Sequence, residues 1–172
     1  GAISRSDLRV ECPSHLQIFD ETLGSLFVSI SVDGDQRAPN GMATVIVSVF
    51  TDIDDWSSNK GKTYLKKKDL IMKTILDILN TKLQLSETSW VHKELATPKS
   101  FERWTGRPAG IVGGLGQHPS QFGPFGLPSR SPLKGLWLCG DSIYPGEGTA
   151  GVSQSALMVS RQIMASKGRL LD

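Results

Sequence analysis

Apolar residues in the first part of the chain follow the spacings of strands. In residues 25–32 they alternate with serines, so that one face is apolar and the other polar, and Phe27 is the exception on the polar face. Residues 42–51 are nearly all apolar or β-branched, a pattern typical of a strand buried on both faces. Because a polar loop joins these two segments, we expect them to be antiparallel neighbours. Residues 16–19 and 90–97 predict two further short strands.

The sequence also predicts an amphipathic helix between these strands. From Asp69 to Leu83 the apolar side chains recur every three or four residues and form a stripe that would pack on a core. Asp69 is a favourable N-cap, whereas lysines are unfavourable in the first turn of a helix. We therefore interpret the lysine-rich, polar residues 52–68 as a solvated loop, with contact to anionic lipid as the alternative. Residues 1–15 show no clear period.

Residues 105–135 contain many glycines and prolines and little periodicity. So long an irregular stretch in a compact protein is usually functional or lies over another domain. The glycine-rich run 110–116 within it lacks the GxGxxG order of a phosphate-binding loop. Pro119 and Pro124 also prevent a helix from following it directly, and we therefore reject a phosphate loop at this place.

Residues 136–158 predict a strand, a tight turn and the start of a helix. The apolar residues 136–138 are expected to form a short buried strand, after which Gly140 turns the backbone and Asp141 presents a carboxylate. The loop that follows contains Pro145, Gly146 and Gly148. Its backbone can approach a ligand closely, and the helix begins near Thr149. Since the N–H groups and the positive dipole end of this helix face the loop, the segment can hold an electron-rich or anionic group.

An ordinary strand-to-helix connection is the alternative interpretation of this segment. Two details favour binding: glycines flank Glu147 on both sides, and Gly151 and Ser155 form a stripe of small residues against which something flat could lie. Apolar residues at helical spacing on the other face of the helix should pack on a sheet. They are Val152, Ala156, Val159 and Ile163.

Two motifs resemble a known family. The first is Gly140-Asp141-Ser142-x-x-Pro145-Gly146-x-Gly148, which is similar to the C-terminal flavin motif of the carotenoid isomerase, retinol saturase and phytoene desaturase group. The second is Thr97-Pro98-Lys-Ser-Phe101-Glu102-Arg103-Trp-Thr-Gly106-Arg107-Pro108-x-Gly110, followed by Gly113-Gly114. It resembles the segment that these FAD-dependent oxidoreductases, relatives of the amine oxidases, carry shortly before the flavin strand. The two matches lie within residues 97–165, whereas residues 1–96 fit the family only in general pattern.

The resemblance implies an α/β (α+β) fold in two parts. Residues 1–100 would be part of a substrate domain, an antiparallel sheet with a helix. Residues 101–172 would be the return to the FAD-binding domain, with the last strand and helix of its Rossmann-like fold. The strand–GxGxxG–helix unit, which the family carries at its N-terminus, occurs nowhere in this sequence. We therefore expect a C-terminal part, inactive alone, whose partner is the N-terminal FAD-binding half of the same protein.

The resemblance also implies roles for individual residues. Asp141 would hydrogen-bond the ribityl–pyrophosphate region of FAD, and the backbone around residues 148–152 would lie near the flavin ring, where the helix N-terminus stabilises negative charge. The expected cofactor-binding residues are Gly140, Asp141, Pro145, Gly146, Gly148, Thr149, Gly151 and Val152. Since a carboxylate beside a reduced flavin would be repulsive, Glu147 should point outwards or pair with an arginine. No residue is identified as a catalytic base, because flavin alone can transfer hydride or electrons.

The substrate implied by the resemblance is a long polyene, carotenoid- or retinoid-like, that is isomerised, saturated or desaturated. The pair Asp141-Ser142 is closer to the isomerases and saturases than to the desaturases, which commonly have Thr-His before Pro-Gly. An enzyme acting on a polyene should touch a membrane, and the resemblance points to a plastid or membrane-associated location. The sequence itself contains no firm anchor and no apolar run long enough to span a bilayer.

Composition and the remaining polar residues exclude several functions. The net charge of +2 gives no indication of a nucleic-acid-binding protein. No histidine stands at the spacing of a metal site, and the Gly-x-Ser-x-Gly motif of hydrolases is absent. Cys12 and Cys139 form no CxxC motif, and Cys139 is expected to be a buried free thiol. We interpret Glu102, Arg103 and Arg107 as a salt-bridge latch, with the lining of a substrate or flavin pocket as the alternative.

Two further functions stay open at this point. One is an amine-oxidase-like flavoenzyme with a small polar substrate, which an aromatic pair facing the flavin would favour. The other is a non-enzymatic, truncated binding module, which would expose the apolar surface that a missing domain covers.

Overall fold

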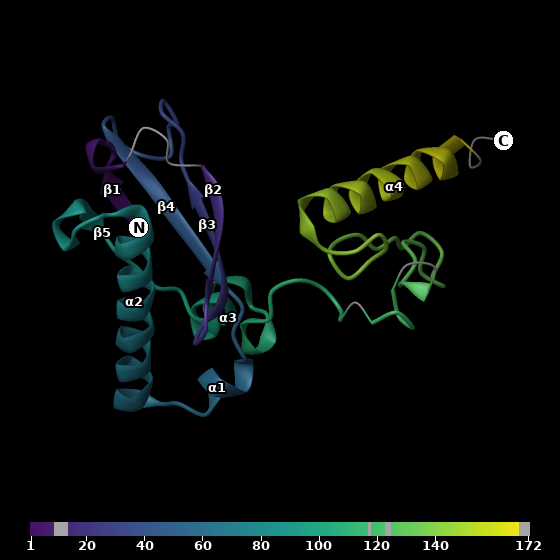
Figure 1. The fold of residues 1–172 in the computed structure, drawn as a ribbon. Coiled ribbons are helices and arrows are strands. Elements are labelled where there is room, and N and C mark those ends of the chain that lie inside the picture. The colour runs from purple at the N-terminus through teal and green to yellow at the C-terminus, as the bar shows by residue number, and fades with distance from the viewer. Residues whose placement is uncertain (9–13, 117, 123–124, 169–172) are drawn as a thin grey trace. The chain divides into compact units, whose positions relative to one another are not determined.

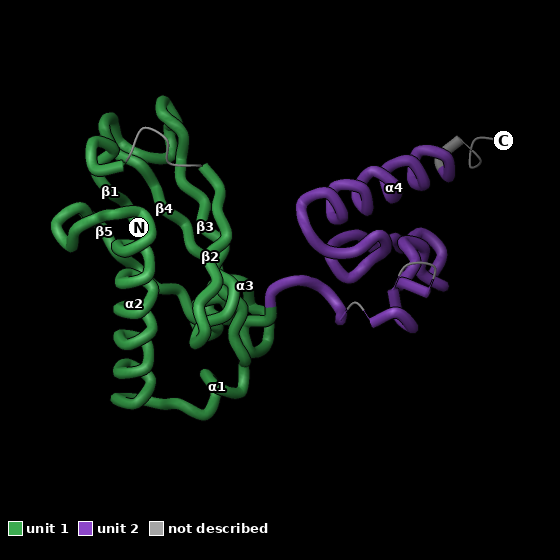
Figure 2. The backbone as a smooth tube through the Cα atoms, viewed as in Figure 1, with its two compact units in different colours: residues 1–111 green, residues 112–172 purple. Residues whose placement is uncertain are grey.

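The computed structural model describes residues 1–8, 14–116, 118–122 and 125–168. The chain forms two compact units, residues 1–111 (unit 1) and residues 112–172 (unit 2), which are described separately (Figure 2). The mixed α/β class expected from the sequence is confirmed. The assignment of residues 1–100 to a substrate domain and of residues 101–172 to an FAD-binding domain stays a prediction.

Unit 1 is built on a five-stranded antiparallel sheet in the order β2-β3-β4-β1-β5 (Figure 1). The strands are β1 (Ala2–Ser4), β2 (His15–Asp20), β3 (Gly24–Ile30), β4 (Met42–Val49) and β5 (Trp90–His92). The prediction that β3 and β4 are antiparallel neighbours is confirmed, with Val28 opposite Val47. The sequence did not predict β1, because a strand of three residues is too short to show a period.

Helix α2 (Gly61–Leu83) covers one face of this sheet (Figure 1). Its buried residues Ile75, Leu79 and Leu83 share a core with the strands. The strand side chains in that core are Ile3, Ile18, Leu26, Val28, Ile30, Ala43, Val45 and Trp90. Burial of one aliphatic side chain is worth roughly 1.5–3 kcal/mol, so this layer is the main source of stability in unit 1.

Helix α2 begins at Gly61, eight residues before the N-cap expected at Asp69. Residues 53–57 and 61–68 of the lysine-rich segment are therefore helical, and the interpretation of the whole segment as a loop is wrong. Contacts from neighbouring segments hold the added turns: the Tyr64 hydroxyl lies 2.7 Å from Thr97 Oγ1, and Lys67 Nζ lies 2.9 Å from a carboxylate oxygen of Asp55. These contacts outweigh the unfavourable interaction of lysines with the helix dipole, which is typically about 0.3–1 kcal/mol.

Shorter elements complete unit 1. Helix α1 (Ile53–Ser57) is capped by the Asp52 side chain and buries Trp56. Helix α3 (Pro98–Thr105) begins with a capping box made by Thr97, and its proline stands in the first turn, where the missing N–H is not needed. The remaining elements are the 3-10 turns η1 (Arg5–Asp7), η2 (Glu87–Ser89) and η3 (Pro108–Gly110).

In unit 2, helix α4 (Gly148–Gly168) lies against a layer of irregular chain (Figure 1). Its start agrees with the helix predicted near Thr149. The described residues before it, from 112 to 147, form mainly turns, bends and irregular chain, with one isolated bridge between Arg130 and Trp137. The irregular structure predicted for the glycine- and proline-rich stretch is thus confirmed.

The apolar residues before the motif do not form a buried strand. Leu136 and Leu138 are 46% and 40% exposed, and Trp137 takes part only in the isolated bridge. The described part of unit 2 contains no sheet that these residues could join. For the same reason, the apolar face of α4 packs on irregular chain, with Val159 buried and Ala156 exposed.

Candidate functional site

Ser155 ties the motif loop, residues 140–147, to helix α4. Its side chain is fully buried, and its Oγ accepts a hydrogen bond from the Gly140 N–H at 3.0 Å. Within the loop, the N–H groups of Ile143 and Gly146 donate to the carbonyls three residues earlier, at 3.2 and 2.9 Å. The loop is therefore two consecutive turns held by its own backbone and by α4.

Two glycines let backbone segments of unit 2 pack directly on this loop. A Cβ on Gly151 would collide with the Gly146 carbonyl, and a Cβ on Gly114 would collide with the Asp141 carbonyl. The sequence suggests that a flat group could lie on the stripe formed by Gly151 and Ser155. In the structure, the motif loop of the chain itself packs on this stripe. Packing of the loop on α4 accounts for these small residues without a ligand.

Other motif residues leave space for a ligand. A Cβ on Gly140 or Gly148 would meet nothing within 4 Å, and both residues have positive φ, 128° and 82°. Thr149 in the first turn of α4 is exposed, and helix N-termini carry N–H groups without helical acceptors. Asp141 is half-buried, with Ser142 Oγ 3.5 Å from its Oδ1. These donors and acceptors fit the polar portion of FAD.

The remaining predicted cofactor residues are less accessible. Gly146 is buried, and Gly151, Val152 and Pro145 are half-buried. The peptide bond between Tyr144 and Pro145 is cis. The structure therefore brings all eight predicted positions to one loop and helix start, but presents only part of them to solvent.

A cavity of about 340 Å³ opens beside the motif loop. Asp141, Ser142 and Tyr144 contribute polar groups to its lining. The apolar lining comes largely from the irregular segment before the motif: Leu115, Phe122, Phe125 and Leu127. The irregular stretch thus folds back on the motif loop within unit 2, which its sequence did not reveal.

The second motif folds around helix α3. A Cβ on Gly110, whose φ is 68°, would collide with the Pro98 carbonyl, so only glycine allows this close approach. Glu102 Oε1 accepts a hydrogen bond from the Ala109 N–H at 3.1 Å. Glu102 therefore acts as a latch through a backbone hydrogen bond, while the Arg103 guanidinium stacks 5.5 Å from the centre of the adjacent tryptophan ring.

Two other expectations concern residues beside the motif. Glu147 is exposed, as expected, and its carboxylate lies against Gly113, where a Cβ would collide with it. Cys139 is a free thiol but is exposed, so the prediction of a buried thiol is wrong. The segment before it is not covered by a sheet, which explains the exposure. Cys12 lies outside the described residues.

The described parts of both units hold no group of three or more His, Cys, Asp or Glu side chains that could bind a metal ion. No helix among them is both long and apolar enough to cross a membrane.

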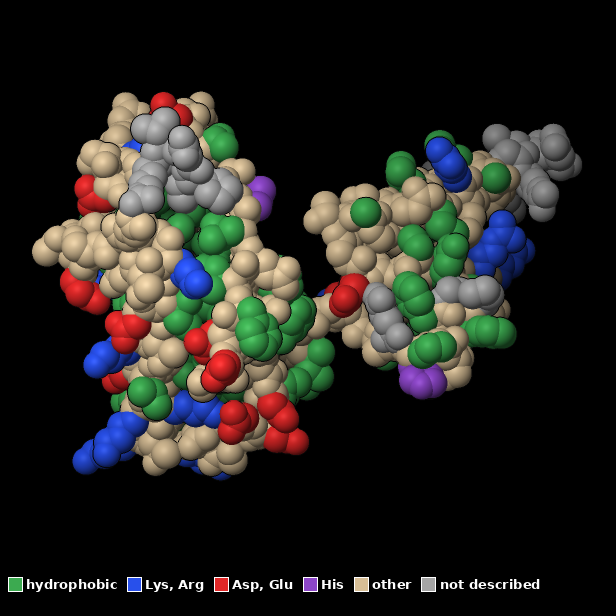
Figure 3. Space-filling model, in the orientation of Figure 1, with side chains coloured by type: hydrophobic (Ala, Val, Ile, Leu, Met, Phe, Trp, Pro, Cys, Tyr) green, Lys and Arg blue, Asp and Glu red, His purple; other side chains and the backbone are tan. Residues whose placement is uncertain are grey.

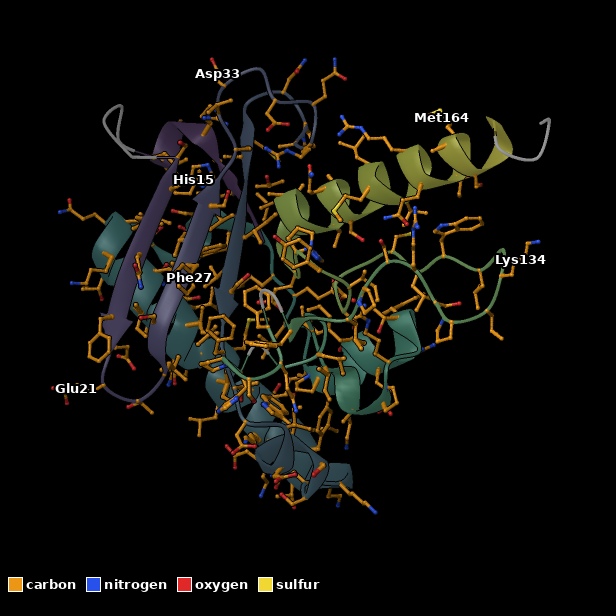
Figure 4. All side chains as sticks on the ribbon, turned by 90° about the vertical axis from the view of Figure 1, so that its right-hand side faces the viewer. His15, Glu21, Phe27, Asp33, Lys134 and Met164 are labelled. Carbon is orange, nitrogen blue, oxygen red and sulfur yellow. The ribbon has the colours of Figure 1, made fainter. Side chains whose placement is uncertain are left out.

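The sheet of unit 1 has a second apolar face, opposite α2, that the described residues of this unit leave uncovered. Phe19, Phe27, Ile46 and Phe50 are 75%, 45%, 53% and 86% exposed on it. The rings of Phe27 and Phe50 meet edge to face, with their centres 6.1 Å apart. Figure 4 looks onto this side of the strands, with α2 behind them, and Figure 3 shows hydrophobic side chains at the surface of both units.

A groove of about 420 Å³ runs along this face. Phe27 and Ile46 supply apolar walls, and the polar lining residues are His15, Gln17, Ser29 and Ser48. The strand register explains the arrangement, since Ser29 lies between His15 of β2 and Ile46 of β4.

The sequence predictions did not include this face as a site. Two features of the sequence could have indicated it. Phe27 interrupts a row of serines, and residues 42–51 are apolar on both faces. The expectation that β4 is buried on both sides is wrong for the described chain, because only the side of Ala43 and Val45 meets the core. An apolar face left open in this way marks a surface that another molecule or segment covers.

Comparison with known proteins identifies relatives of the chain. It is 34% identical over 148 residues to the chloroplastic prolycopene isomerase of Daucus carota, a match that covers 84% of the chain and 24% of that protein. It is 30% identical over 161 residues to the chloroplastic prolycopene isomerase of Arabidopsis thaliana, with 89% and 27% covered. The chain is a relative of the prolycopene isomerases. The resemblance to the carotenoid isomerase group is thereby confirmed.

A further relative is the pyridine nucleotide-disulfide oxidoreductase domain-containing protein 2 of Rattus norvegicus, 28% identical over 122 residues, with 67% of the chain and 21% of that protein covered. The chain spans about a quarter of the length of these relatives. No family model matches the chain. No solved structure matches it significantly.

Proposed function

We propose that this chain is a portion of an FAD-dependent oxidoreductase that acts on a carotenoid- or retinoid-like polyene by isomerisation, saturation or desaturation. The similarity to the prolycopene isomerases carries the proposal. The N-terminal FAD-binding half of the same protein would be the partner that completes the cofactor site. The chloroplastic relatives support a plastid location.

Within this proposal, unit 2 contributes to the cofactor site. Asp141 would accept a hydrogen bond from a cofactor hydroxyl, and the backbone of Gly148 and Thr149 would meet electron-rich atoms at the N-terminus of α4. FAD, when bound, supplies the acceptor and donor of electrons. The anchoring of the loop by Ser155 keeps the Asp141 carboxylate at a fixed place next to the helix.

The open sheet face of unit 1 would receive the polyene. Its phenylalanines offer flat apolar area, and the groove beside Phe27 gives an elongated molecule a place to lie. Burial of apolar surface contributes roughly 25 cal/mol for each Å², which favours a long hydrocarbon body over a small polar substrate.

The coding sequence upstream of Gly1 tests the proposal most directly. An in-frame segment that encodes a strand, GxGxxG, a helix and a following acidic residue would support it. A start codon immediately before Gly1 would overturn it, because the adenine half of FAD would then have no binding unit in the same chain.

Flavin content of the longer protein gives a second test. Asp141→Asn should lower the ratio of bound flavin to protein at least several-fold, because a charged acceptor of a hydrogen bond is lost. Asp77→Asn, on an exposed position of α2, is the matched control and should leave the ratio unchanged. Equal flavin content in the two variants would argue against the role given to Asp141.

One observation favours a second candidate, a non-enzymatic binding module. Leu133, Leu136 and Leu138 of unit 2 are 67%, 46% and 40% exposed, and exposed apolar surface can mark a protein-binding site. The coding sequence upstream of Gly1 distinguishes the two candidate functions, because a start codon immediately before Gly1 would favour the binding module.

A further inference from the structure

We propose that the first turns of α2 are a docking surface for the anionic surface of a lipid membrane. The surface, which we call the basic patch, consists of Lys60, Lys62, Leu65, Lys66, Leu70 and Lys73. The inference does not depend on the proposed function, because it uses only the charge, spacing and exposure of side chains at the start of α2. It assigns an interaction to residues that neither the cofactor site nor the polyene surface involves.

Positive charge is concentrated in this part of the chain. Residues 60–73 contain six lysines and one acidic residue, Asp69, and so carry a net charge of +5. The whole chain carries +2, which leaves a net charge of −3 on all other residues together. In Figure 3, blue side chains lie at the end of unit 1 where α2 begins, and red side chains gather beside α1. An anionic surface would therefore be attracted to this end of unit 1 and not to the molecule as a whole.

The helix brings three of the lysines to one side. Lys62, Lys66 and Lys73 are separated by four and seven residues, a spacing that places them on one face at 3.6 residues per turn. All three are exposed. Ile75 and Leu79 mark the opposite side of α2, since both are buried in the core of unit 1. The lysine face is thus free to meet a flat surface.

Lys67 differs from the lysines of the basic patch. Its Nζ lies 2.9 Å from a carboxylate oxygen of Asp55 and 5.0 Å from the centre of the Trp56 ring. Lys67 therefore joins α1 to α2 and serves the fold. Lys60 and Lys62 stand at the start of the helix, where positive charge opposes the helix dipole. The stability of α2 does not explain lysines at these two positions, whereas an anionic partner does.

Two leucines distinguish the basic patch from an ordinary solvated face. Leu65 and Leu70 are 56% and 65% exposed. On the helix surface Leu65 neighbours Lys62 and Leu70 neighbours Lys66, because residues three and four apart are adjacent. Long lysine side chains can keep their ammonium groups at the lipid headgroups while neighbouring leucines enter the apolar layer. Charge and apolar area are thus arranged as in a helix that lies in the membrane interface.

The composition of the basic patch favours lipid over a nucleic acid or an acidic protein. The patch contains no arginine and no aromatic side chain. Arginine and aromatic residues dominate protein-binding hot spots, and aromatic side chains stack on the bases of single-stranded nucleic acids. Lysine is a compact charge on a flexible stem, which can follow a fluid layer of headgroups without fixed geometry.

Vesicle sedimentation with the 172-residue chain tests the inference. Vesicles of equal parts of phosphatidylcholine and phosphatidylglycerol are compared with vesicles of phosphatidylcholine alone. Each lysine near an anionic surface raises the affinity roughly fivefold, so we expect binding to the anionic vesicles to be at least about tenfold tighter. Added salt should weaken this binding, because salt screens exposed charges.

Lysine variants locate the binding on α2. The triple variant Lys62→Gln, Lys66→Gln, Lys73→Gln should bind the anionic vesicles at least about tenfold more weakly than the parent chain. A control removes the same charge from exposed lysines outside the patch and should stay within about twofold of the parent chain. The control variant is Lys82→Gln, Lys93→Gln, Lys134→Gln. Circular dichroism of each variant verifies that the sheet and helices are retained.

A leucine variant tests the apolar part of the contact. Leu65→Ser, Leu70→Ser leaves the charge of the chain unchanged and removes both exposed apolar side chains of the patch. Loss of two leucines that would enter the lipid should weaken binding roughly tenfold or more. The salt dependence should stay that of the parent chain, because the lysines remain.

Three outcomes would overturn the inference. The first is equal binding to both kinds of vesicle, or binding to neither. The second is an equal loss of binding in the two lysine variants, because net charge and not the basic patch would then be responsible. The third is unchanged vesicle binding in the double leucine variant. Binding of the chain to polyglutamate but not to anionic vesicles would indicate an acidic protein segment as the partner instead.

Discussion

At the scale of single residues, unit 2 depends on a few small side chains at close backbone contacts. Ser155 supplies a buried acceptor to Gly140, and Gly151 and Gly114 allow the loop carbonyls to approach without a Cβ between them. Each contact joins the motif loop to a neighbouring segment. The position of Asp141, and with it any role in binding, therefore depends on these contacts within unit 2.

Ser155→Ala should loosen the motif loop. The Gly140 N–H would lose its acceptor in a buried place, at a cost of about 1–3 kcal/mol. We expect faster amide hydrogen exchange at Gly140 and a lower stability of unit 2 in hydrogen-exchange measurements. Ser153→Ala, an exposed serine on the same helix, should change neither. Unchanged exchange at Gly140 would contradict the anchoring role of Ser155.

The ion pair between Asp35 and Arg37, in the loop between β3 and β4, gives a prediction about pH. Hydrogen bonds from the Arg37 side chain and backbone lower the pKa of Asp35 to about 2. Because the pKa of an unfolded Asp is about 3.9, the pair stabilises the folded state above pH about 4, and this contribution is lost as the pH falls towards 2. Arg37→Gln should return the pKa of Asp35 towards its ordinary value, as measured by NMR titration of the carboxyl carbon. Arg161→Gln in α4 is a control that should leave the titration of Asp35 unaltered.

At the scale of elements, the first turns of α2 show tertiary contacts overriding local preference. Lys60 stands at the N-cap and has no side-chain capping bond, and lysines follow it in the first turns. Contacts with a neighbouring helix hold this helix start in the absence of a side-chain cap. Lys99 of α3 donates to the Asn59 carbonyl at 2.9 Å and lies over the Tyr64 ring. The start of α2 is thus a joint property of α1, α2 and α3.

Tyr64→Phe should therefore fray the start of α2 and leave its centre intact. Loss of the hydroxyl contact with Thr97 should lower the free energy of unfolding by about 1 kcal/mol and speed amide exchange over residues 62–68. Tyr144→Phe, the same chemical change at a half-exposed position of unit 2, is the control. If both variants exchange alike over residues 62–68, tertiary anchoring of the helix start is refuted.

At the scale of the whole molecule, the two units differ in how much core they possess. Of the buried hydrophobic side chains among the described residues, only Ile143 and Val159 lie in unit 2. Unit 1 contains a continuous core between its sheet and α2. A small unit without a sizeable core is marginally stable by itself, because burial of apolar area is the main driving force of folding.

We therefore expect the two units of this chain to open independently. Amides of α4 should exchange faster than those of β3, β4 and the centre of α2 when exchange is followed by mass spectrometry under native conditions. Addition of mild denaturant should widen the difference. Equal protection of α4 and α2 would show that unit 2 has a source of stability beyond its own core.

The sequence by itself determined the elements whose patterns are long or strongly spaced. The alternation around Phe27 and the apolar run after it predicted β3 and β4, and the helical stripe up to Leu83 predicted the core-facing part of α2. The motif from Gly140 to Gly148 located the loop before α4 and identified the family. These features depend on neighbours in the chain or on a specific run of residues, and so they can be found without the fold.

The tertiary structure alone decided features that depend on contacts between distant residues. It placed β1 within the sheet and extended α2 to Gly61, because partners from elsewhere in the chain satisfy these segments. It packed Gly151 against the loop and left Cys139 exposed, because the residues of unit 2 that the structure describes form no sheet that could cover the segment before the motif. Periodicity shows that a side chain is apolar, but which face of an element is covered depends on what the rest of the molecule brings to it.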